Sequence, residues 1–184
     1  MSIRLFVALR PPAAVREQLL GTMRGIPGAR WQADEQLHLT LRFIGAVDER
    51  TADAVAAVLG QVHAAAPTVR IAGTGRFDGR SAAQALWAGV QPHDALQQLH
   101  RKVDAACARA GLEPERRAYL PHITLARFAA RSGRAPEITD WLADTAALAS
   151  TPFTCGHLIL YEGELGRDGA AYSPLERWPL AVPG

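Results

Sequence analysis

The 184-residue chain has only two cysteines and no long hydrophobic run. Cys107 and Cys155 lie far apart and match no metal-binding or redox spacing, so we expect two reduced, partly buried thiols. No apolar stretch approaches the ~18 residues that a membrane span needs. The first residues lack the layout of a signal peptide, because Arg4 interrupts a short apolar run that ends at two prolines. We therefore expect a cytoplasmic protein with no membrane partner.

Lysine is also scarce, since Lys102 is the only one among 20 basic residues. The net charge of +2 and the pI of 8.8 are too mild to indicate nucleic-acid binding by themselves. Arginine suits bidentate recognition of phosphate, so the bias is compatible with a phosphate ligand without predicting one. No G-x-x-x-x-G-K, G-x-G-x-x-G or G-x-S-x-G motif is present, which argues against nucleotide-binding loops and serine-nucleophile elbows.

The hydrophobic pattern mixes strands and helices without regular βαβ alternation, which favours an α+β fold. No low-complexity linker divides the chain, so we expect a single domain over residues 1–184. The expected strands cover residues 3–10, 29–32, 68–77, 85–90, 153–161 and 171–180, together with two strands that carry a His-x-Thr motif. The expected helices run from Pro12 to about Gly25, from an N-cap at Asp48, over 94–110 with Gly111 as C-cap, and over about 136–148. Residues 78–84 are expected to form a turn, and the Gly-rich segment 162–171 lies between the last two strands.

The His-x-Thr motif occurs twice, in "LHLTLRFIG" at Leu37–Gly45 and in "LPHITLARF" at Leu120–Phe128. Random order of this composition would give only about 0.08 such motifs with apolar residues at the second and fourth positions. Either motif alone is typical of a half-exposed strand with a polar outer face. The matched pair instead indicates two halves of one site.

Strand alternation places the imidazole and the hydroxyl of each motif on one face, about 7 Å apart. His38 and Thr40 thus point away from Leu39 and Leu41, which anchor the strand in the core. By the same alternation, Phe43 belongs to the core face. In the second motif, His122 and Thr124 are presented while Ile123 and Leu125 are the anchors.

Two histidines can supply a base for a nucleophile and an acid for a leaving group near neutral pH. Threonine hydroxyls beside them can donate hydrogen bonds to phosphate oxygens. A zinc site is the weaker interpretation, because no third Cys, Asp or Glu stands at ligand spacing. We therefore expect no metal and no cofactor.

The paired motifs, the opening "RLFVAL" strand and the closing "LYEGELGRDGAAYSPLERWPL" resemble the 2H phosphoesterase superfamily, in particular its RNA 2′,3′-cyclic phosphodiesterases, also called 2′-5′ RNA ligases. The resemblance implies a bilobal fold of two largely antiparallel sheets with outer helices, related by a pseudo-twofold axis, with the active cleft between the lobes. It also implies metal-independent hydrolysis of a 2′,3′-cyclic phosphate to a 2′-phosphate, with 2′-5′ ligation as the reverse reaction. By the family pattern, His38 would be the proton donor and His122 the proton acceptor. Thr40 and Thr124 would hold the phosphate.

Two arginines follow the motifs and are further candidates for phosphate binding. Arg127 matches an arginine of the family, but strict alternation turns it away from His122, so a bulge or a strand end would be needed to aim it at phosphate. Arg42 has the correct parity to share a face with His38. Gly163 departs from the family, whose members often carry serine there.

Three interpretations remain open at this point. The first is the RNA 2′,3′-cyclic phosphodiesterase, a monomer acting on RNA with cyclic phosphate ends, such as tRNA fragments. The second is an RNA- or nucleotide-binding module without useful turnover. The third is a related enzyme for a smaller substrate, such as a cyclic nucleotide or an ADP-ribose cyclic phosphate.

Overall fold

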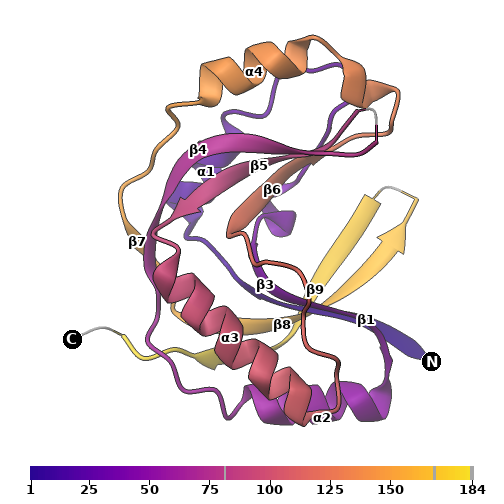
Figure 1. Ribbon diagram of the computed structural model, residues 1–184, viewed down its shortest axis with the longest axis vertical. Helices are drawn as coiled ribbons and strands as arrows, with labels where there is room; N and C mark the ends of the chain where they lie inside the picture. The colour runs from indigo at the N-terminus through magenta and orange to yellow at the C-terminus, as the bar shows by residue number, and fades with distance from the viewer. Residues whose placement is uncertain (81, 168, 183–184) are drawn as a thin grey trace.

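The computed structural model describes residues 1–80, 82–167 and 169–182, arranged as two antiparallel sheets with helices on their outer sides (Figure 1). Ser81 and Asp168, from the expected turn and the Gly-rich segment, lie outside the described residues. No helix in the described ranges is long and apolar enough to cross a membrane.

The first sheet has four strands in the order β3-β1-β8-β9. Its central strand β1 is buried from Leu5 to Leu9, as its continuous apolar sequence predicts. The strands are β1 (Ser2–Leu9), β3 (Leu39–Asp48), β8 (His157–Gly166) and β9 (Gly169–Pro179).

The second sheet has five strands in the order β2-β6-β5-β4-β7. The first His-x-Thr motif lies at the start of β3 and the second at the start of β6, so each sheet carries one motif. The strands are β2 (Arg30–Trp31), β4 (Thr68–Asp78), β5 (Ala83–Gln91), β6 (His122–Arg127) and β7 (Phe153–Thr154).

The order of elements repeats in the two halves of the chain, as a pseudo-twofold relation requires. The run β1–α1–β3–α2 corresponds to β5–α3–β6–α4, and in both runs the two strands pair with each other. The helices of the described residues are α1 (Ala13–Leu20), α2 (Glu49–Leu59), α3 (Asp94–Arg109) and α4 (Glu137–Thr145), with short 3₁₀ helices at Asp34–Gln36 and Ser132–Arg134.

The expected ends of α2 and α3 are confirmed. The Asp48 side chain accepts a hydrogen bond from the Thr51 N–H at 2.7 Å, which satisfies one of the unpaired donors at the start of α2. Gly111 adopts a φ of +91° just after α3, a conformation that residues with a Cβ rarely adopt.

Two expectations about local structure were wrong. Helix α1 ends at Leu20 rather than near Gly25, and the Thr22 hydroxyl donates to the Leu19 carbonyl at 2.7 Å where the chain turns. Most of the Gly-rich segment does not separate two strands but lies within them, since residues 162–166 belong to β8 and residues 169–171 to β9. Glycine is usually depleted in strands. Here Gly163 pairs with Tyr172, whose ring would lie 3.6 Å from an added Cβ, so the neighbouring aromatic side chain covers the position.

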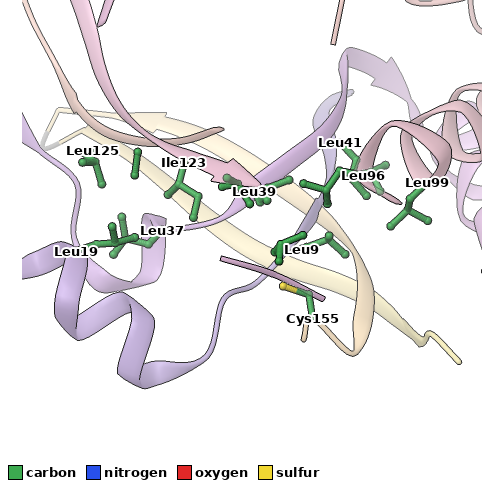
Figure 2. Packing of buried hydrophobic residues seen from close by; sticks show 14 of the residues in the cluster. Leu9, Leu19, Leu37, Leu39, Leu41, Leu96, Leu99, Ile123, Leu125 and Cys155 are labelled. Atoms are coloured by element: carbon green, nitrogen blue, oxygen red, sulfur yellow. The ribbon is translucent and has the colours of Figure 1, made fainter. Parts of the chain in front are cut away.

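A single cluster of buried side chains receives residues from both sheets (Figure 2). Leu39 and Leu41 are 0% and 2% exposed, and Ile123 and Leu125 are both fully buried in the same cluster. The apolar positions of the two motifs are therefore core residues, as expected from strand alternation. Cys107 and Cys155 are buried and unpaired, as expected.

Arg42 does not share a face with His38, so the prediction from simple alternation was wrong. The side chain is 7% exposed, forms an ion pair with Asp104 of α3 and donates to the backbone carbonyl of Glu113. It also donates to the Phe43 carbonyl at 3.0 Å. These bonds attach β3 to α3 and to the segment that leads into β6, which gives Arg42 a structural role in place of the expected phosphate contact.

We expect Arg42→Met to lower the free energy of unfolding by about 2–4 kcal/mol, because it leaves the carboxylate of Asp104 without its cation in a largely buried place. Urea denaturation would measure the change. Arg101→Met, at an exposed position of the same helix, should change stability by less than about 0.5 kcal/mol. The double variant Arg42→Met/Asp104→Leu should recover part of the loss; a double variant as unstable as the sum of the two single variants would contradict the pairing.

Candidate active site

A β-bulge in β3 decides which side chains accompany His38. Along β1, Ala8 lies opposite Thr40 while the adjacent Val7 lies opposite Arg42, so Leu41 is an extra residue. The bulge reverses the alternation beyond Leu41, which explains why Arg42 faces the core.

The same bulge brings Phe43 to the face of Thr40, where it lies opposite Phe6 with ring centroids 5.8 Å apart. Phe43 is 60% exposed, so its expected place in the core was wrong.

A second bulge occurs at the corresponding point of β6. Leu86 lies opposite Ala126 and Trp87 lies opposite Thr124, so Leu125 is the extra residue. Arg127 is thereby returned to the face of Thr124, and it lines the cavity described below. This is the local geometry that the sequence argument required for Arg127 to approach a phosphate.

His38 lies in an aromatic environment at the start of β3. Its ring is 4.8 Å from that of Phe6, 5.1 Å from that of Tyr172 and 5.9 Å from that of Tyr161. Its Nδ1 is buried without a hydrogen bond of good geometry among the described residues, although the Gln36 carbonyl favours the charged ring.

Burial lowers the pKa of His38 to about 4, and the positive charges of Arg10, Arg127 and His122 contribute in the same direction. His38 is therefore neutral near pH 7 in the unliganded protein. The influence of His122 and Arg127 on His38 also indicates that residues of the two sheets share one electrostatic environment.

His122 is held in a defined orientation at the start of β6. Its Nδ1 lies 2.7 Å from the Leu120 carbonyl, to which it donates, so the neutral ring carries its lone pair on Nε2. The ring contacts Phe77 at 4.9 Å and Trp87 at 6.2 Å, measured between centroids. Burial lowers the pKa of His122, and the charge of Arg127 lowers it further. A neutral imidazole with a free Nε2 is the form that can accept a proton.

Two side chains that sequence reasoning missed hold the backbone of the first motif. The Tyr119 hydroxyl donates to the Thr40 carbonyl at 3.1 Å, and Nδ1 of His100 lies 2.7 Å from the Leu41 carbonyl. The two rings stack with centroids 4.3 Å apart. Burial raises the pKa of Tyr119, so its hydroxyl keeps the proton that it donates. No sequence pattern joins these residues to a strand about 60 to 80 positions away.

A cavity of about 810 Å³ opens beside His38 and extends along both sheets. Phe6 and Tyr172, which contact the His38 ring, form part of its wall, and so does Phe43. Among the residues that the structure describes, four arginines and no acidic residue line the cavity. These arginines are Arg4, Arg30, Arg127 and Arg167.

Tyr172 and Gly163 form the part of this wall that lies next to His38. Tyr172 is partly exposed there, whereas Tyr161 is 4% exposed and packs against Phe6 of the wall. A Cβ on Gly163 would make only ordinary contacts, 3.6 Å from Tyr172 and 3.7 Å from Phe6, so the serine common in the resembled family would fit. With glycine at this position, any contact from that serine side chain is missing.

Among the described residues, no group of three or more His, Cys, Asp or Glu side chains is arranged so that it could hold a metal ion, at the two histidines or elsewhere. The expectation of a metal-free reaction remains a prediction for experiment.

Comparison with known proteins agrees with the architecture and with the paired motifs. The model of the 2′-5′ RNA ligase superfamily matches residues 11–167. An RNA 2′,3′-cyclic phosphodiesterase of Escherichia coli K12 is 31% identical over 96% of this chain and 96% of its own length. A protein of the same name from Geobacillus stearothermophilus is 33% identical over 84% of this chain, which spans about half of that relative's length (49%).

Among solved structures, E. coli LigT complexed with 3′-AMP superimposes with a TM-score of 0.75. The two proteins are 27% identical, and the match covers 98% of this chain and 99% of the other. The chain belongs to the 2′-5′ RNA ligase superfamily of 2H phosphoesterases.

Proposed function

We propose that this protein is an RNA 2′,3′-cyclic phosphodiesterase that opens terminal cyclic phosphates to 2′-phosphates. The observation that carries the proposal is that each of the two sheets presents one His-x-Thr motif, and that the charges of His122 and Arg127 act on the pKa of His38 across the two sheets. Arg127 also lines the adjoining cavity, where none of the described lining residues is acidic. Two curated relatives with this activity in their names, at 31% and 33% identity, support it.

In the proposed reaction, His122 Nε2 takes a proton from water as the water oxygen attacks phosphorus. His38 Nε2 gives its proton to the 3′ oxygen as the bond between phosphorus and O3′ breaks, leaving the phosphate on O2′. One proton enters and one leaves, so the pair of histidines exchanges protonation states in each turnover. Attack by a ribose 5′ hydroxyl on the same cyclic phosphate gives the 2′-5′ ligation product.

The phosphate is held by hydroxyl and guanidinium groups on the same face as the histidines. Thr40 and Thr124 donate hydrogen bonds to its non-bridging oxygens, and Arg127 supplies positive charge as the negative charge on phosphorus increases. Both threonines lie two residues after a motif histidine, which keeps each hydroxyl beside the ring that it serves.

Substrate binding also prepares the protonation state of the site. The same positive charges that depress the His38 pKa attract an anionic phosphate, and the bound phosphate then favours the imidazolium form. The site therefore becomes competent to donate a proton when its substrate is present.

We place the enzyme in the cytoplasm as a monomer acting on RNA with cyclic phosphate ends, including tRNA fragments. One chain supplies both histidines, and its buried unpaired thiols suit a reducing compartment.

Replacing either motif histidine should abolish most of the activity. We expect His38→Ala and His122→Ala to lower kcat on a nucleoside 2′,3′-cyclic phosphate about 10²–10⁴-fold each, and the double variant should be little worse than either one. Product release followed by chromatography would measure the rate and distinguish 2′-phosphate from 3′-phosphate. His63→Ala, at an exposed position, is the matched control. A 3′-phosphate product would contradict the assignment of the leaving oxygen, and loss of wild-type activity in EDTA would contradict the metal-free mechanism.

Anion binding should depend on pH through His38 and His122. A bound anion favours the charged rings and so raises the pKa of His38 and the pKa of His122. The affinity for the anion therefore increases as the pH falls from the ordinary histidine pKa near 6.5 towards 4, the pKa of His38 in the free protein. Sulfate is the suitable probe, since it does not itself titrate there. Competition by sulfate should strengthen by up to about tenfold per pH unit for each proton taken up. His38→Gln should lose the part of this dependence that belongs to His38, and a pH-independent affinity in the wild type would refute the coupling.

A further inference from the structure

Arg30 and Arg127 are arranged in a way that the folded protein alone does not explain. They lie directly opposite each other where β2 pairs with β6, and like charges at such positions destabilise a sheet. Among the described residues, neither forms an ion pair and no acidic side chain lines the cavity that they share. Two adjacent cations without a counter-charge indicate that anionic groups of a ligand lie between and beyond them.

Arg4, on the wall formed by the other sheet, is a third cation of this cavity without an ion pair among the described residues. It lies on β1, four residues from Ala8, which pairs with Thr40. At a rise of ~3.4 Å per residue this is about 14 Å of strand, so Arg4 lies well away from the position opposite Thr40.

Arg127 and Arg30 lie on different strands relative to the second motif. Arg127 is on β6, the strand that carries His122, whereas Arg30 is on the edge strand β2. In agreement with this placement, Arg127 is among the charges that lower the pKa of His38 and of His122, and Arg30 and Arg4 are not.

We propose that Arg30 and Arg4 form a second phosphate subsite, which binds the 5′-phosphate of the terminal nucleotide, the group that links it to the rest of an RNA chain. The proposal rests on the function proposed above and specifies its substrate as a chain of at least two nucleotides. The rings of Phe43 and Tyr172 line the same cavity and offer apolar faces to the nucleoside. The cavity volume of about 810 Å³ lies in the upper part of the usual range for ligand pockets, which leaves room for a nucleotide with phosphates at both ends.

Equilibrium binding tests the subsite without relying on turnover. Adenosine 2′-phosphate and adenosine 2′,5′-bisphosphate differ only by the 5′-phosphate, and calorimetry at fixed low salt gives both affinities. We expect the bisphosphate to bind about tenfold more tightly, since a partly exposed charge-assisted contact is worth about one factor of ten. This preference should shrink as salt is raised.

Arg30→Gln and Arg4→Gln should each reduce the preference at least threefold. Arg101→Gln removes the same charge from an exposed helix position outside the cavity and should retain the full preference. Equal binding of the two ligands by the wild type would overturn the subsite. Equal weakening of both ligands in Arg30→Gln and Arg4→Gln would also overturn it, because these arginines would then serve the reacting phosphate.

A turnover assay separates the subsite from the proposed activity. Uridine 2′,3′-cyclic phosphate lacks a 5′-phosphate, while the dinucleotide with the same cyclic end has one. The ratio of their kcat/KM values should favour the dinucleotide about tenfold and fall in the two cavity variants. Failure to hydrolyse either substrate, together with tighter binding of the bisphosphate, would refute the phosphodiesterase and support the phosphate subsite.

Discussion

The burial of both motifs' apolar residues in one core is the constraint on which the site depends. Leu39 and Leu41 from β3 pack in the same cluster as Ile123 and Leu125 from β6 (Figure 2). Because side chains alternate along a strand, burying these residues exposes the histidine and threonine of each motif on the other face. The packing of the two sheets is stabilised by the hydrophobic effect, and the histidines and threonines of the motifs take their positions as a geometric consequence. A substitution in this core would change stability and the relation between the two histidines together.

The bulges at Leu41 and Leu125 interrupt the alternation of side chains at the same point of the two motif strands, three residues after the histidine. Simple alternation predicts the faces of His38 and Thr40 and of their counterparts in β6. It fails for Arg42 and Phe43, which lie between the bulge at Leu41 and a second register shift at Ile44, and for Arg127 beyond the bulge at Leu125. It therefore misplaced Arg42 and Phe43. Sequence reasoning recognised the strands, most helix ends and the paired motifs, because these depend on local patterns. The bulges, the contacts of Tyr119 and His100, and the shortened α1 depend on neighbours that are distant in the chain, and no local pattern reports them.

The electrostatics of the cleft are incomplete without an anion. Burial and nearby arginines hold both histidines in the neutral form, and the arginines of the cavity wall form no ion pairs among the described residues. A protein surface with such a field attracts phosphate at long range and gains most from it once water is displaced. This arrangement lowers the stability of the folded protein, because the like charges of Arg30 and Arg127 lie opposite each other without an ion-pair partner among the described residues. Such a loss of folding stability is expected where the arrangement of charges serves the binding of an anionic ligand.

Departures from pseudo-twofold symmetry give the two histidines different surroundings. The two sequence motifs are too similar to distinguish them. Phe43 and Arg127 occupy equivalent positions, five residues after His38 and His122, so one sheet presents an aromatic ring where the other presents a cation. Burial lowers the pKa of both histidines, and each has a backbone carbonyl that favours its charged ring, that of Gln36 for His38 and that of Leu120 for His122. The surroundings differ in two other respects: His38 lies among three aromatic rings, and the hydrogen bond from Nδ1 of His122 to Leu120 leaves Nε2 of the neutral ring free to accept a proton. This difference agrees with the proposed role of His122 as proton acceptor, while the role of His38 as proton donor follows from the family pattern.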